Sequence, residues 1–121
     1  MTNGENPKRY DLEERTYEFA RRVRAFIKLL HKTLANIEDA KQLIRASGSV
    51  GSNYIEANEA LSKKDFLMRI KICRKEAKES RFFLRLIDTA DNDQAEREQQ
   101  ALIQEAQELT NIFGAIFRKS E

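Results

Sequence analysis

Apolar residues recur every three or four positions along nearly the whole chain, and this spacing is the period of one face of an α-helix. The first such stretch contains Phe19, Ala20, Val23, Phe26, Ile27, Leu30 and Leu34. The chain has only one proline and four glycines in 121 residues, so it lacks the residues that the many tight turns of a β fold need. We therefore predict an all-α fold.

The apolar stripes divide into four predicted helices, over about 12–33, 36–61, 65–87 and 93–119. Asn36, Ser62 and Asp93 stand where N-caps are expected, because their side chains can accept a hydrogen bond from a free backbone N–H. Short connections favour antiparallel neighbours, so the prediction is an up-down-up-down antiparallel four-helix bundle. We expect a disordered tail over 1–10 and a single domain over 11–119.

Two glycines, Gly48 and Gly51, lie inside the second predicted helix. A glycine in a helix interior costs about 1 kcal/mol relative to alanine, which usually reflects a packing requirement. One interpretation breaks the helix into a loop at 47–52. The other keeps it continuous, because the apolar stripe stays in phase across the glycines, and lets a neighbouring helix approach closely. We favour the continuous helix.

The sequence shows no sign of export or of a membrane segment. It has one cysteine, Cys73, no apolar signal segment and no run of membrane-spanning length. These features predict a cytoplasmic protein without membrane association. Cys73 lies on a core stripe, as expected for an inert buried thiol, and the single histidine, His31, lies among lysines, as expected at a surface. We expect no catalytic residue, no metal and no cofactor.

Two pairs of carboxylates leave one enzymatic alternative open. Glu56 with Glu59, and Glu76 with Glu79, form E-x-x-E motifs. All-α nucleotide pyrophosphatases hold Mg²⁺ with such pairs, since the ion prefers oxygen ligands. The motif is common by chance in a chain rich in glutamate, and lysines beside the second pair suggest ordinary salt bridges. A Mg²⁺-dependent nucleotide hydrolase is therefore the weaker alternative.

Charge is distributed unevenly along the chain. Residues 62–89 contain nine basic and four acidic residues, a net charge of +5, whereas residues 90–117 contain one basic and six acidic residues, a net charge of −5. Such asymmetry indicates either a basic binding face or two helices that neutralise each other.

Basic residues on the first and third predicted helices each follow a helical spacing and form two rows. The rows are Arg21, Arg24, Lys28 and Lys32 on the first helix, and Lys71, Arg74, Lys78, Arg81 and Arg85 on the third. Rows of this kind bind the phosphates of RNA or DNA without reading bases. The alternative is a solvated face that pairs with the acidic fourth helix.

The third predicted helix also carries a second apolar row, formed by Met68, Ile72, Phe83 and Leu86. One bundle core needs only one stripe, so the second row predicts an oligomer interface. On the second predicted helix, Arg45, Ser49, Asn53 and Glu56 share a polar face. We favour a hydrogen-bonded stripe that holds a neighbouring helix or subunit. A ligand-binding stripe is the alternative.

Four short segments between Arg45 and Leu84 resemble the 23S rRNA intervening-sequence family of four-helix bundle proteins. They are SVGSNYIEA from Ser49, SKKDF from Ser62, KEAKES from Lys75 and FFL from Phe82. The polar residues that match the family pattern are Arg45, Ser49, Asn53, Glu56, Glu76 and Glu79. Ser80 and Phe83 depart mildly from it, because the family often has Thr and Trp there.

This resemblance implies an antiparallel bundle that assembles as a ring-like homopentamer, with no catalytic residues to transfer. A relative, the accessory protein of diversity-generating retroelements, binds nucleic acid and a reverse transcriptase. The expected partners are therefore further copies of the chain, RNA or DNA, and a nucleoprotein enzyme.

Overall fold

The computed structural model describes residues 7–121, with side chains described from residue 11 onward, and these residues form four helices and no strand. The helices are α1 (Pro7–Ile27), α2 (Leu34–Asn58), α3 (Lys63–Leu86) and α4 (Asp93–Ser120). The predicted all-α class is confirmed. Residues 7–10 of the predicted tail belong to α1, and residues 1–6 lie outside the described residues.

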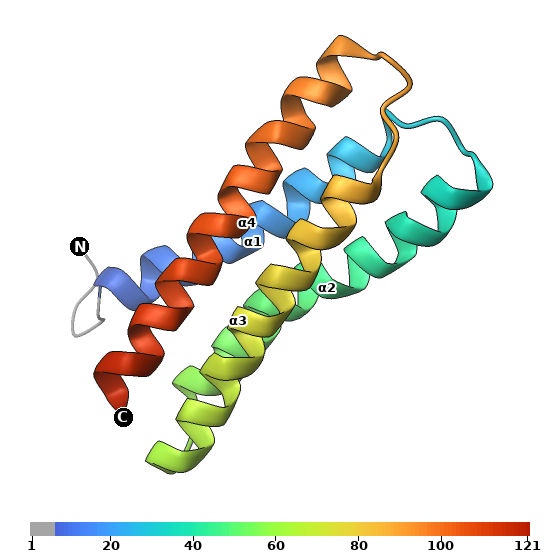
Figure 1. Cartoon of the computed structure of the whole chain (residues 1–121). Coiled ribbons are helices and arrows are strands. Elements are labelled where there is room, and N and C mark those ends of the chain that lie inside the picture. The colour runs from blue at the N-terminus through green and yellow to red at the C-terminus, as the bar shows by residue number, and fades with distance from the viewer. Residues whose placement is uncertain (1–6) are drawn as a thin grey trace.

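Each helix packs against the next one along the chain, and α4 packs back against α1. Figure 1 shows the alternating directions of the four helices, which make the predicted up-down-up-down bundle. Among the described helices, the backbones of α1 and α3 do not come close to each other, so these two helices occupy diagonal positions. Any surface on the outer side of α1 therefore lies apart from a surface on the outer side of α3.

Side chains from all four helices meet in one core. The largest fully buried ones include Phe19, Phe26, Leu43, Val50, Ile70, Leu84, Leu102, Leu109 and Phe113. Burying a large apolar side chain contributes about 1.5–3 kcal/mol, and these residues occupy the predicted stripes. The stripes therefore identified most of the core positions, but not all, since Leu34 of the first stripe is 81% exposed at the start of α2.

The connection between α1 and α2 differs from the prediction. Helix α1 ends at Ile27 rather than near Thr33, and Thr33 rather than Asn36 is the N-cap of α2, accepting from the Asn36 N–H at 3.2 Å. Asn36 is buried and its amide joins two connections. It donates to the carbonyl oxygens of His31 (3.1 Å) and Asp88 (2.9 Å) and accepts from the Asp88 N–H (3.1 Å). A cap at Thr33 frees this amide for the tertiary contact.

Of the other two predicted N-caps, Ser62 is confirmed and Asp93 is wrong. The Ser62 hydroxyl accepts from the Asp65 N–H at 3.1 Å, which confirms Ser62 as the cap of α3. Asn92, not Asp93, caps α4, with its side-chain oxygen accepting from the Ala95 N–H at 2.9 Å. Asp93 is the first helical residue, where its negative charge is favourable near the helix N-terminus.

Helix α2 runs without a break through Ser47–Ser52, as the phase of its stripe predicted. Close packing at Gly51 accounts for a glycine inside the helix, despite the free-energy cost of glycine relative to alanine. A Cβ at Gly51 would lie 2.9 Å from the Thr16 Oγ1 and 3.2 Å from the Thr16 Cβ. The absence of a side chain at Gly51 therefore allows α1 and α2 to approach each other closely.

Candidate functional site

The basic residues of α3 lie on its flank toward α4. We call Lys71, Arg74, Lys78, Arg81 and Arg85 the α3 basic row. Their spacings of three and four keep them on one face, and Gly114 of α4 identifies which face it is. A Cβ at Gly114 would lie 3.4 Å from the Arg74 Nε, so Arg74 extends against α4.

Opposite this row, α4 presents neutral residues. Gln107, Asn111 and Gly114 follow one another at spacings of four and three, so they share the α4 flank toward α3. The Gln107 amide donates to the Asn111 Oδ1 at 3.0 Å. Among the described residues, no carboxylate forms a salt bridge with any member of the α3 basic row.

Three of the five acidic residues of α4 pair with α1 instead. Arg15 donates to Glu105 and Glu108, each at 2.8 Å, and Arg22 donates to Glu98 at 2.8 Å. The bond from Arg15 to Glu105 is the main cause of a raised pKa for Arg15, while bonds from Gln104 and then Arg15 lower the pKa of Glu108. The direct pairing of α4 with the α3 basic row that the alternative expected is therefore not found among the described salt bridges.

Two members of the row have unusual environments. The Lys71 Nζ lies 5.6 Å from the centre of the Phe117 ring, a favourable cation–π geometry that holds the ammonium beside α4. The Arg81 Nε is buried and has no hydrogen-bond partner among the described residues. A buried donor without a partner costs free energy, so this guanidinium has unused hydrogen-bonding capacity.

The predicted basic row of the first helix does not form. Lys28 and Lys32 lie on the connection after Ile27, beyond the end of α1. Arg21 pairs with Glu18 of its own helix at 2.8 Å, and Arg24 donates to the Ala20 carbonyl oxygen at 2.9 Å. Because α1 and α3 are diagonal, the two sets of basic residues do not make one surface.

The second apolar row of α3 lies on the opposite flank, toward α2. Met68 and Leu86 are 48% and 51% exposed, while Ile72 and Phe83 are half-buried. Phe82 is 54% exposed and contacts Phe83 edge to face with ring centres 5.3 Å apart. Phe82 was not in the predicted row. Exposed apolar side chains of this size suit a protein interface, which stays a prediction.

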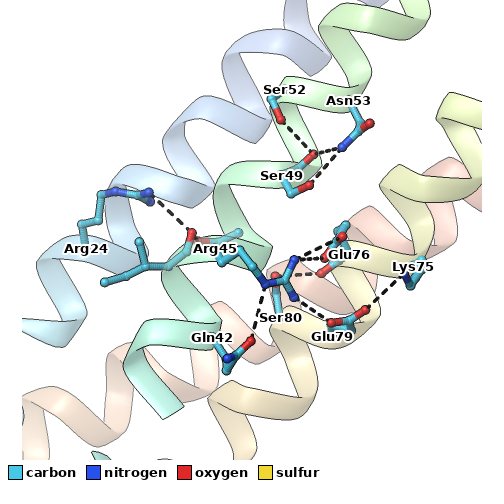
Figure 2. Close-up of polar contacts among 12 residues, drawn as sticks. Arg24, Gln42, Arg45, Ser49, Ser52, Asn53, Lys75, Glu76, Glu79 and Ser80 are labelled. Carbon is cyan, nitrogen blue, oxygen red and sulfur yellow. Dashed lines mark hydrogen bonds and ion pairs between the residues drawn. The ribbon is translucent and has the colours of Figure 1, made fainter. Parts of the chain in front are cut away.

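A polar network on the same flank joins α2 to α3, as Figure 2 shows. Arg45 contacts Glu76 at 3.3 Å and Glu79 at 2.9 Å, and Lys75 lies 3.9 Å from Glu79. The side chain of Glu76 is only 8% exposed. A carboxylate so deeply buried needs its cation, so Arg45 stabilises the packing of α2 on α3.

Of the other residues in the predicted polar stripe, only some form hydrogen bonds with each other or with α3. Asn53 donates to Ser49 on its own helix at 3.0 Å and accepts from Arg69 of α3 at 3.0 Å. Glu56 is exposed and takes no part in these contacts. The contacts fit the helix-holding interpretation better than a ligand-binding stripe. Arg69 was missed because no pattern linked it to Asn53.

The two E-x-x-E pairs do not converge. Glu76 and Glu79 are bound to Arg45, whereas Glu56 lies eleven residues further along α2, about 16 Å at 1.5 Å per residue. No group of three or more metal-ligating side chains occurs among the described residues. The Mg²⁺ hydrolase alternative therefore has no site in this arrangement.

Cys73 and His31 lie where the sequence predicted. Cys73 is fully buried, and this burial raises the pKa of its thiol to about 12, so the nucleophilic thiolate is disfavoured. His31 is exposed on the connection after α1.

Arg118 is a candidate residue that the sequence patterns missed. A Cβ at Gly114 would lie 3.3 Å from the Arg118 Nη1, so Arg118 and Arg74 meet at the same point of α4. The two arginines are 44 positions apart, and only the packing of α3 on α4 brings them together.

Comparisons with known proteins identify a family and a similar solved structure. The model of the family described as 23S rRNA-intervening sequence protein matches residues 8–115. A crystal structure of a protein with unknown function from the S23 ribosomal protein family of Bacteroides thetaiotaomicron is similar, with a TM-score of 0.73 and 25% identity over 87% of this chain and 96% of that one. No curated protein matches the chain.

None of the helices that the structure describes is both long and apolar enough to cross a membrane.

The family match covers most of the bundle, and the similar crystal structure has the same fold. The chain therefore belongs to the 23S rRNA-intervening sequence protein family.

Proposed function

We propose that this protein is a non-enzymatic homo-oligomer that binds the phosphate backbone of RNA or DNA through the α3 basic row and acts as an accessory factor in a nucleoprotein complex. One observation carries the proposal: the five cations of the row have no carboxylate partner among the described residues, although the neighbouring helix is acidic. Three of the five acids of that helix, Glu98, Glu105 and Glu108, are paired with α1, and none is paired with the α3 basic row, which leaves the α3 charges available to an external polyanion.

The dimensions of the row suit a nucleic-acid backbone. Lys71 and Arg85 are fourteen residues apart, about 21 Å along the helix axis. Duplex DNA carries one negative charge per about 1.7 Å of its axis, so a row of this length can contact several phosphates. The family is named for 23S rRNA and the similar crystal structure is of an S23 ribosomal protein family member, so structured RNA is the first ligand to test.

Oligomerisation is compatible with this use of α3. Arg74 and Glu76 are two residues apart, about 200° around the helix, so the flank toward α4 and the flank toward α2 point in different directions. Copies that associate through Met68, Ile72, Phe83 and Leu86 keep their basic rows free. Several rows on one particle would raise the effective concentration of binding sites for a long polyanion.

The test compares two double variants with the same change in charge. Lys78→Gln with Arg85→Gln removes two charges from the α3 basic row, and Lys28→Gln with Lys32→Gln removes two from the α1–α2 connection. Binding of labelled structured RNA and duplex DNA is measured across a salt series. The proposal expects the slope of log K against log salt to be shallower by about two contacts in the first variant only.

Equal losses in both double variants would place binding elsewhere than α3. No binding of either nucleic acid at low salt would overturn the proposal. It would favour the second candidate, a scaffold for a protein partner, which the exposed apolar row supports.

A further inference from the structure

We propose that Arg74, Arg118 and Lys71 form a discrete site for one phosphate group beside Gly114, at the seam between α3 and α4. As the anchor of a nucleic-acid backbone, this site rests on the function proposed above. It also names a residue, Arg118, that lies outside the α3 basic row.

Gly114 creates the space that brings the cations together. A Cβ there would lie 3.3 Å from the Arg118 Nη1, 3.4 Å from the Arg74 Nε and 3.7 Å from the Arg74 Cδ. Both guanidinium groups therefore lie against the backbone of α4. The Arg118 Nη1 and the Arg74 Nε both lie close to the same Cβ position, so the separation between these two nitrogens is at most the sum of their distances from it.

Lys71 supplies a third charge about one helical turn away on the same flank. It precedes Arg74 by one helical turn, and its ammonium lies over the ring of Phe117, which follows Gly114 by one turn. The cation–π contact keeps the Lys71 ammonium near α4 rather than free in solvent.

No carboxylate in the described part of the chain pairs with these charges. Among the described residues, none of the three cations forms a salt bridge. Asn111 is the α4 residue one turn before Gly114, and it is neutral. Like charges held this close repel each other, so an external anion relieves repulsion as well as gaining hydrogen bonds.

The chemistry of the donors points to phosphate. Guanidinium groups present several N–H donors in a planar fork that matches the oxygens of a phosphate, and a lysine adds a point charge. Both a phosphodiester and free inorganic phosphate have such oxygens. The experiment therefore has one arm for each source.

The first arm titrates inorganic phosphate into the full chain at constant ionic strength, with chloride as the matched salt, and follows binding by calorimetry. Arg118→Gln is compared with Lys119→Gln, because Lys119 is a neighbouring exposed cation and is not among the side chains nearest to a Cβ at Gly114. Loss of one charge-assisted contact predicts phosphate affinity about tenfold lower in Arg118→Gln. Lys119→Gln should change it less than about twofold.

Gly114→Asp is an independent variant, because it places a carboxylate between the two arginines. It should abolish phosphate binding in a chain whose helical circular dichroism is unchanged. Equal phosphate affinity in Arg118→Gln and Lys119→Gln would overturn the site, and so would a wild-type chain that binds phosphate no better than chloride.

The second arm repeats the comparison with labelled RNA. A larger loss of RNA affinity in Arg118→Gln than in Lys119→Gln supports a backbone anchor. If RNA binding depends on Lys78 and Arg85 but not on Arg118, the proposed function stands and this site falls. If phosphate binds selectively and RNA does not bind, the site stands for a free phosphate and the proposed function falls.

Discussion

Gly51 of α2 and Thr16 of α1 meet where the two helices leave no room for a side chain at position 51. A Cβ at Gly51 would lie 2.9 Å from the Thr16 Oγ1 and 3.7 Å from the Thr16 carbonyl carbon. Thr16 is 1% exposed and its hydroxyl donates to the Glu13 carbonyl oxygen at 2.9 Å, so it has little freedom to move away. Gly48, one turn earlier, would meet only the Arg24 Nη2 at 3.4 Å.

We predict that Gly51→Ala and Gly48→Ala have opposite effects on the free energy of unfolding. Overpacking against Thr16 should make Gly51→Ala less stable by about 1–3 kcal/mol. Gly48→Ala should gain about 0.4–1 kcal/mol, because alanine favours the helix and the end of Arg24 is flexible. Urea denaturation measures both. The loss in Gly51→Ala should shrink when Thr16→Ala removes the clashing hydroxyl, and equal effects of the two alanines would contradict the close approach.

Removing Arg45 should destabilise the bundle, because the carboxylate of Glu76 would stay buried without a cation. We expect Arg45→Ala to lose about 1–3 kcal/mol of unfolding free energy. Lys41→Ala is the control, since it breaks an exposed salt bridge with Glu38 on the surface of the same helix. Thermal unfolding compares the two. If Arg45→Ala in a Glu76→Gln background costs as much as in the wild type, the coupling between the two residues is absent.

Charged residues in the apolar row should prevent formation of the proposed oligomer. Met68→Glu and Leu86→Glu each place a carboxylate on an exposed apolar position of α3, so burial against another copy would leave an unpaired charge. Tyr17→Glu is the control, because Tyr17 is 60% exposed on α1, away from this flank. We expect sedimentation velocity to show monomers for the first two variants and the wild-type assembly for the third. A monomeric wild type would refute the interface.

The fold could be predicted from the sequence because the patterns that specify each helix are local. Apolar residues at spacings of three and four define helix faces, and the phase of the second stripe showed that Gly48 and Gly51 lie within a helix. Helix ends were less predictable. Asn36 resembles a cap in the sequence, but its amide bridges the connections around His31 and Asp88, which is a contact between distant segments.

Only the local part of the candidate site could be predicted from the sequence. The spacing of the α3 basic row comes from the helix alone, whereas its availability depends on which neighbour takes the acids of α4. Sequence charge could not distinguish pairing with α3 from pairing with Arg15 and Arg22 of α1, because both partners are basic. Arg118 carried no local signal at all, since it joins Arg74 only through tertiary packing.

The buried thiol of Cys73 should make stability fall at high pH. Burial raises its pKa from 9.0 to about 12, so between these values the unfolded chain loses the thiol proton while the folded chain keeps it. The unfolded state then binds fewer protons, and the free energy of unfolding decreases with pH by up to about 1.4 kcal/mol per unit.

Cys73→Ala lacks this titration, so its stability should fall less steeply above pH 9. All other ionisable groups are the same in both chains and cancel in the comparison, and the cavity left by alanine lowers the whole curve without changing its slope. Urea denaturation at pH 7, 8, 9 and 10 gives the two slopes. Parallel curves above pH 9 would show that the Cys73 thiol ionises in the folded protein as readily as in the unfolded one.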